Sequence, residues 1–186
     1  DIVMNSVRAG ATRILITIEE AGDRLDFTVE DNGGGMTPEQ IARLSDPFFT
    51  TRKTRRVGLG VPFLKMLAEM TGGFVQVTSR PAPKVPEGEP LPQKGDGGGH
   101  GTRITARFGR HHIDFLPLGD MAGTLVTLIQ GAPECDFLFR HTRDGKEVSL
   151  STEEIRTVLG DGISLAEPEV LAWIGENLRE QYKNLP

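Results

Sequence analysis

The feature that most constrains the fold is a run of glycines placed directly after an alternating segment. Residues 25–29 alternate apolar and polar side chains with a period of two, which predicts a strand, and the sequence DNGGGM begins at Asp31. A run this rich in glycine is not regular structure, so a loop must begin where the strand ends. The strand therefore carries the Asp31 carboxylate to the edge of a sheet, beside a backbone that bears no side chains.

The sequence on both sides of this loop predicts a mixture of strands and helices. Period-two alternation predicts strands at residues 13–18, 25–29, 74–79 and 102–108, and the turn residues 21–23 predict that the first two strands form a hairpin. Helical spacing, or a capping box with proline at the first helical position, predicts helices ending near Gly10, starting at Thr37, and spanning residues 60–71. The helix at residues 60–71 is predicted to be buried, because Phe63, Leu64, Leu67 and Met70 are apolar and recur at helical spacing. Prolines and glycines at residues 81–100 predict a flexible hairpin insertion.

The pattern restarts after Gly109, so we expect two units, residues 1–109 and 110–186. In the second, strands are predicted at 112–116, 136–141 and 146–150, and helices at 120–130, 152–159 and 167–183. Apolar stripes on the first and last helices predict packing against each other and against the hairpin at 136–150. The stripe of the last helix consists of Val170, Leu171, Trp173, Ile174 and Leu178. We expect a small α/β layer docked on the first sheet, acting as an interaction or regulatory element.

Composition excludes several classes of function. A formal net charge of −5 does not favour binding to nucleic acid or to an anionic membrane surface. Cys135 is the single cysteine and cannot form an intramolecular disulfide, which fits a reducing, cytoplasmic setting. No stretch approaches the ~18 apolar residues of a membrane span. Because Asp1 stands inside a predicted helix, we expect further residues upstream.

Four segments resemble, in order, the ATP-binding motifs of the Bergerat-fold (GHKL) ATPases, over residues 1–108. They are DIVMNSVRAGAT from Asp1, DNGGG from Asp31, DPFFTTRK from Asp46, and GLGV from Gly58. The third resembles the phenylalanine box of sensor histidine kinases, which gyrase and MutL lack, whereas the end of the first is similar to MutL. The resemblance implies an α+β fold, a two-layer α/β sandwich that binds Mg-ATP, followed here by a C-terminal α/β extension.

The resemblance also implies residue roles. Spacing of four puts Asp1 and Asn5 on one helix face, where Asn5 is the candidate Mg²⁺ ligand. Arg8 would contact phosphate, as the basic residue does in histidine kinases. Asp31 would accept a hydrogen bond from the adenine amino group, and Thr102 would reach the adenine site through water. The remaining expected nucleotide contacts are Gly33, Gly35, Met36, Phe48, Thr51, Arg56, Gly58, Leu59 and Gly60.

A basic stretch between the third and fourth motifs is expected to be a lid that orders over the triphosphate. Within it, Lys53 and Arg56 are the expected γ-phosphate contacts, and Lys53 is a candidate catalytic residue. Asp1 is the other candidate, because water-splitting members of the family carry a glutamate at this place. Aspartate is shorter by one methylene, so hydrolysis is expected to be handicapped.

Three functions stay open at this point. The phenylalanine box and Arg8 favour a kinase that transfers the γ-phosphoryl group to a histidine outside this chain, on a phosphoacceptor or signalling protein. Asp1 favours a hydrolysing ATPase, and the extension favours a nucleotide-gated interaction module. His100, His111 and His112 lie after the glycine motifs and are expected to be surface or loop residues rather than acceptors. Any homodimer would form through residues upstream of Asp1.

Overall fold

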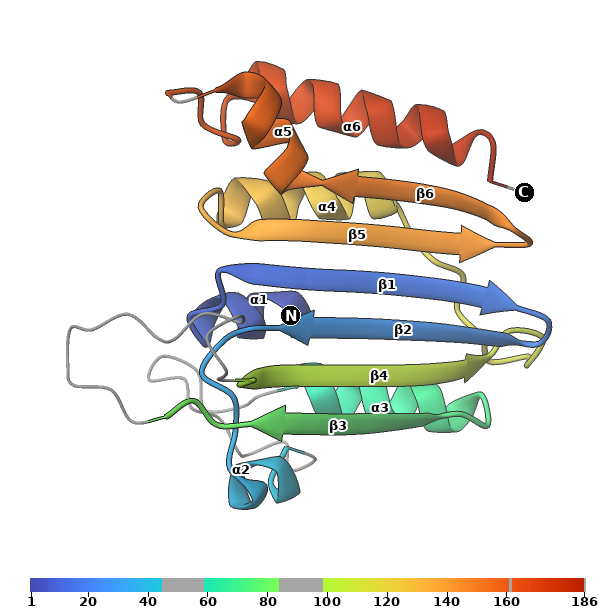
Figure 1. Cartoon of the computed structure of the whole chain (residues 1–186). Coiled ribbons are helices and arrows are strands. Elements are labelled where there is room, and N and C mark those ends of the chain that lie inside the picture. The colour runs from blue at the N-terminus through green and yellow to red at the C-terminus, as the bar shows by residue number, and fades with distance from the viewer. Residues whose placement is uncertain (45–58, 84–98, 161, 186) are drawn as a thin grey trace.

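The protein, described by a computed structural model over residues 1–44, 59–83, 99–160 and 162–185, is built on one six-stranded sheet (Figure 1). The strand order is β3-β4-β2-β1-β5-β6. The strands are β1 (Arg13–Ala21), β2 (Arg24–Asp31), β3 (Phe74–Arg80), β4 (Gly101–Gly109), β5 (Asp136–Arg143) and β6 (Lys146–Ser151). The helices are α1 (Ile2–Arg8), α2 (Pro38–Ala42), α3 (Gly60–Met70), α4 (Met121–Gly131), α5 (Thr152–Leu159) and α6 (Pro168–Tyr182).

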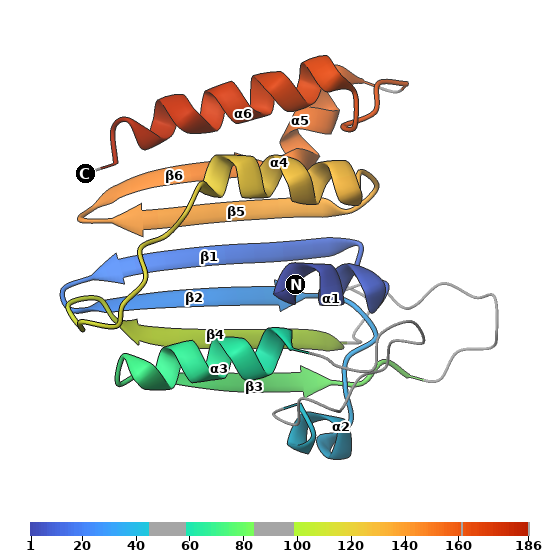
Figure 2. The ribbon, with the colours of Figure 1, turned by 180° about the vertical axis from the view of Figure 1, so that it is seen from behind.

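The sheet and its helices form two layers, which confirms the predicted α+β class. Figures 1 and 2, taken from opposite sides, place α1, α3 and α4 over the same face of the sheet. On β1 the side chains of Ile14, Ile16 and Ile18 point to this face and are at most 2% exposed. The alternation that predicted the strand therefore marks the face that is buried. Within the described ranges, no helix is long and apolar enough to cross a membrane.

The first four strands are antiparallel neighbours. β1 and β2 form the predicted hairpin, in which Ala21 pairs with Arg24 and Gly22 takes a positive φ of 56°. β3 and β4 also pair antiparallel, so the insertion between them joins the two strands of a hairpin, as predicted. Its residues 84–98 lie outside the described residues. The predicted capping box is confirmed, because Thr37 and Gln40 each bond the other's backbone.

Helix α3 is less buried than its apolar spacing predicts. Val61 and Ala68 are its buried residues, whereas Phe63 and Met70 are 56% and 46% exposed. The helix lies over β3 and β4 at one edge of the sheet (Figure 2), so a single side of it is covered in the described part of the chain. On the covered side, Val61 and Ala68 are buried and Leu64 and Leu67 are partly buried. The prediction of burial is therefore wrong for Phe63 and Met70.

The C-terminal half extends the same sheet instead of forming a separate layer, which corrects the predicted arrangement. β5 pairs parallel with β1, from Arg13 opposite Asp136 to Glu20 opposite Arg143. A parallel neighbour needs a crossover, and α4 supplies it. Buried residues of both halves form one continuous apolar core. The unit boundary at residue 110 stays a prediction.

Two smaller predictions for this half are wrong. Residues 112–116 form turns and no strand, because the segment folds back on the first hairpin: the N–H of Arg110 donates to the carbonyl of Asp23, and Phe115 packs edge-on against Phe108. Trp173 was assigned to the buried stripe of α6 but is 54% exposed. Three members of that stripe, Leu171, Ile174 and Leu178, are buried as predicted.

A buried polar chain crosses the junction between the halves. Glu20 at the end of β1 and His141 on β5 have side chains 8% and 3% exposed, and their Oε1 and Nε2 atoms lie 2.9 Å apart. The hydroxyl of Tyr182 on α6 lies 3.0 Å from Nδ1 of the same ring. A neutral imidazole satisfies both contacts, with Nε2–H donating to Glu20 and Nδ1 accepting from Tyr182. The hydrogen bonds among Glu20, His141 and Tyr182 therefore link α6 to the sheet.

The buried contacts of His141 predict that the stability of the protein depends on pH. Burial lowers the pKa of His141 below its ordinary 6.5, although the hydrogen bond to Glu20 opposes the shift and nearby Arg143 and Arg110 add to it. The unfolded protein then binds more protons than the folded one in acid, so the free energy of unfolding falls as the pH drops below about 6.5. Urea unfolding at about pH 7.5 and about pH 5.5 should show this loss, with His141→Gln reducing it.

The matched control is His112→Gln, since that ring is exposed on a turn. It should keep the parent's dependence on pH. An unchanged pH dependence in the His141 variant would contradict the role given to the buried ring.

Candidate functional site

The Asp31 carboxylate ends β2 and is held in place before any ligand arrives. The residue is 9% exposed, and its two oxygens accept from three donors of different segments. Oδ2 accepts from the hydroxyl of Ser6 at 2.6 Å, and Oδ1 from the N–H groups of Gly33 at 2.9 Å and Thr102 at 3.3 Å. Hydrogen bonds to a carboxylate favour its charged form and fix its orientation. The arrangement presents a rigid acceptor at the sheet edge.

The glycine loop that follows is shaped by contacts that exclude side chains. A Cβ at Gly35, whose φ is 66°, would lie 1.9 Å from the carbonyl oxygen of Arg80. A Cβ at Gly101, whose φ is 127°, would lie 2.0 Å from that of Asp31. Both positions therefore require glycine, and the loop runs close against the ends of β3 and β4.

Helix α1 and the start of α3 lie against each other beside this loop. A Cβ at Gly60 would lie 3.2 Å from Cβ of Asp1 and 3.9 Å from the amide nitrogen of Asn5. The guanidinium of Arg8 donates to the amide oxygen of Asn5 at 3.1 Å. Segments almost sixty residues apart in sequence thus bring an amide, a carboxylate and a helix N-terminus together.

The start of α3 can receive an anion. Its N-cap is Leu59, which makes no side-chain capping bond, and no acidic residue stands in its first turn. Backbone N–H groups at a helix start carry a partial positive charge and bind phosphate well. Because Gly60 has no Cβ, this end of the helix approaches Asp1 and Asn5 closely.

Comparison with known proteins decides the family. Residues 1–112 match the family described as histidine kinase-, DNA gyrase B-, and HSP90-like ATPase. The chain belongs to this ATPase family. It is an ATPase domain of the kind found in sensor histidine kinases, as the motifs predicted. Residues 113–186 lie outside the match.

Relatives of this ATPase domain are sensor kinases of bacteria. The chain is 33% identical over 97 residues to the probable C4-dicarboxylate sensor kinase of Bacillus subtilis, covering 52% of this chain and 18% of that protein. It is 35% identical over 82 residues to the sensor histidine kinase ZraS of Salmonella typhi, covering 42% and 17%. The chain therefore spans less than a fifth of the length of either relative.

Among solved structures, similarity extends to the mycobacterial sensor histidine kinase MprB, at 20% identity and a TM-score of 0.40, over 58% of this chain and 64% of that one. The family assignment rests on the sequence match.

The predicted contact residues that the structure describes lie near the end of the sheet where β2 ends and β4 begins. Beside those above, Met36 donates its N–H to the hydroxyl of Ser79 at 2.8 Å, and the Ser79 hydroxyl lies 2.9 Å from that of Thr102. Leu59 precedes α3 and is 59% exposed. Five predicted residues lie outside the described residues, namely Phe48, Thr51, Lys53, Arg56 and Gly58. The predicted lid lies there too.

Sequence reasoning missed three residues that shape this ATPase site. Ser6 lies in the first motif and Ser79 in a predicted strand, but neither was predicted to contact other residues of the site. His100 lies in a loop, as expected, but it is buried at 8% exposure, with Nδ1 2.8 Å from the carbonyl oxygen of Gly33. The serine following Asn5 in the first motif was the one available signal. Nothing in the sequence marks Ser79 or His100.

Proposed function

We propose that the chain binds Mg-ATP where β2 ends, next to α1 and the start of α3. The fixed Asp31 carboxylate carries this proposal. A carboxylate in this position accepts from the adenine amino group and discriminates against guanine, which has a carbonyl there. The donors from Ser6, Gly33 and Thr102 occupy the carboxylate without neutralising it, so capacity to accept remains.

The triphosphate and its metal ion fit the residues next to Asp31. The amide oxygen of Asn5 is a hard ligand of the kind that Mg²⁺ takes beside phosphates. Arg8, which donates to that oxygen in this structure, would turn its remaining donors to a phosphate. The N-terminus of α3 would supply backbone N–H groups that also bind phosphate.

We propose γ-phosphoryl transfer to a histidine outside this chain as the reaction. The support is the kinase-like motif beginning at Asp46 and the sensor kinases among the relatives. Hydrolysis is a second candidate, because Asp1 lies beside Asn5 and Gly60, where an attacking water would be positioned. A third is a nucleotide-gated interaction module that uses the extension.

Incubation with γ-labelled ATP and Mg²⁺ separates these candidates. We expect label on an added acceptor protein that carries a histidine-bearing dimerisation helix, and little free phosphate. Rapid release of phosphate without acceptor would favour the ATPase. Binding of ATP with neither product, across several such acceptors, would favour the interaction module.

The variant Asp1→Asn tests the second candidate directly. The amide keeps the shape and hydrogen bonding of the side chain but cannot act as a base, so ATP affinity should stay nearly unchanged while any hydrolysis is abolished. Phosphate release and calorimetric affinity are the two measurements. Asp23→Asn in the β1–β2 turn is the matched control, since its side chain is 74% exposed and far along the strand. Hydrolysis that survives in the Asp1 variant would remove this residue from the reaction.

A further inference from the structure

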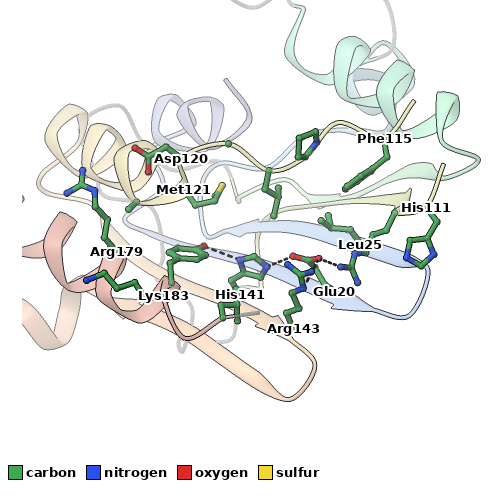
Figure 3. A pocket seen from close by; sticks show the side chains of 17 residues that line it. Glu20, Leu25, His111, Phe115, Asp120, Met121, His141, Arg143, Arg179 and Lys183 are labelled. Carbon is green, nitrogen blue, oxygen red and sulfur yellow. Dashed lines mark hydrogen bonds and ion pairs between the residues drawn. The ribbon is translucent and has the colours of Figure 1, made fainter. Parts of the chain in front are cut away.

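A second pocket lies at the other end of the sheet, where the two halves of the chain meet (Figure 3). It has a volume of about 690 Å³, within the range of sites for small organic ligands. Its floor is the Glu20–His141–Tyr182 chain. The segment leading into α4 and residues of α6 form its walls. Neither half encloses it alone.

The pocket combines positive charge with apolar surface. Four cationic side chains line it, Arg110, Arg143, Arg179 and Lys183, against two acidic ones, Glu20 and Asp120. Apolar walls come from Leu25, Phe115, Pro117, Leu118, Met121 and Leu185. The chain as a whole is negative, so this local excess of positive charge runs against the overall composition.

The acidic groups are already engaged by the protein. One oxygen of Glu20 receives His141 and the other receives Arg110 at 2.8 Å. Asp120 caps α4 by accepting from the N–H of Gly123 at 2.8 Å. Glu20 is therefore paired through both of its oxygens, and one oxygen of Asp120 is used by the cap.

Two of the cations retain donors. The buried Nε of Arg143 makes no hydrogen bond within the described residues and lies 3.7 Å from Glu20. The guanidinium of Arg179, an exposed residue, makes no hydrogen bond or ion pair with the described residues. A buried donor without an acceptor costs free energy until a ligand supplies one.

We propose that this pocket binds a small organic anion, with an apolar body against the Met121 wall and its charged group beside Arg179. Glu20 lies six residues along β1 from Ile14, the partner of Asp31, which separates the two sites by about 20 Å. The pocket is therefore distinct from the nucleotide site and does not depend on the function proposed for it. An anion bound there contacts both halves of the chain at once.

Titration of the full chain with 8-anilinonaphthalene-1-sulfonate, an aromatic anion, tests this proposal by fluorescence. We expect saturable binding that persists with ATP present. Arg179→Gln removes a guanidinium that has no partner among the described residues, so it should weaken binding of the probe about tenfold, the effect of losing ~1.4 kcal/mol, without lowering the melting temperature. Gly119→Trp should do the same by filling the pocket, since a Cβ there meets nothing within 4 Å.

Matched controls locate the effect. Arg140→Gln changes a cation on the opposite face of β5, where it pairs with Glu147, and Gly131→Trp adds the same indole at the far end of α4. Both should keep the parent's affinity. Parent affinity in the Arg179 and Gly119 variants, or no binding of the probe at all, would overturn the proposal. So would loss of binding only in Trp173→Ala, which alters the apolar groove between α5 and α6.

Discussion

Asp31→Asn is expected to weaken ATP binding by roughly 30- to 150-fold, which corresponds to about 2–3 kcal/mol for the loss of a buried charged hydrogen bond. In the folded chain this carboxylate accepts from Ser6, Gly33 and Thr102. An amide must turn its NH₂ group toward some of these donors or toward the adenine amino group. Either orientation sets donor against donor. Isothermal calorimetry on protein of verified fold measures the effect.

Two controls isolate this change. Asp23→Asn makes the same substitution at an exposed turn and should leave ATP affinity as in the parent. Ser6→Ala removes one donor to the carboxylate and keeps the charge, so its loss of affinity should be smaller than that of Asp31→Asn. Unchanged affinity in the Asp31 variant would remove the proposed adenine contact.

Deletion of residues 165–186 is expected to unfold the protein at ordinary temperature. The segment includes Leu165, Leu171, Ile174 and Leu178, which are all at most 6% exposed. Burying each contributes roughly 1.5–3 kcal/mol in transfer terms, and a domain's net stability is only about 5–15 kcal/mol. Circular dichroism of the truncated chain, followed through a thermal melt, measures the outcome. A truncated protein with the parent's melting temperature would show that the segment is an independent module.

Point variants test the same packing in a chain that still folds. Ile174→Ala should lower the free energy of unfolding by roughly 2–5 kcal/mol, because the side chain is fully buried and leaves a cavity. Trp173→Ala at the neighbouring position is the control. Its side chain is half exposed, so its cost should be clearly smaller. Equal losses would contradict the burial pattern of α6.

Local pattern was sufficient to predict most elements. The isoleucines of β1 alternate because one face of the strand is buried, and the capping box at Thr37 satisfies the backbone groups of a helix start. These signals depend on neighbours in sequence, so they can be read from a single chain. The nucleotide motifs belong to the same class, because each is a short segment whose residue types match a contact.

Long-range pairing could not be predicted in this way. The parallel pairing of β5 with β1 joins residues that are far apart, and strand 136–141 looked the same whether it extended a sheet or started a new one. The burial of His100 depends on the path of the Gly33 backbone, which no residue pattern encodes. The predicted burial of Phe63 and Met70 on the outward side of α3 was wrong for a similar reason. Apolar spacing identifies a helix face but does not supply the surface that covers it.

The position of β1 has a consequence for how the chain reaches its folded state. β1 and its hairpin partner β2 are synthesised well before residues 136–143, which supply the strand on the other side of β1. Pairing between distant segments is slow, since a long loop must close before the contacts form. In the meantime β1 offers a row of backbone donors and acceptors along an apolar strand, and such edges associate readily between chains. Pairing with β5 removes this exposed edge once the C-terminal half has been made.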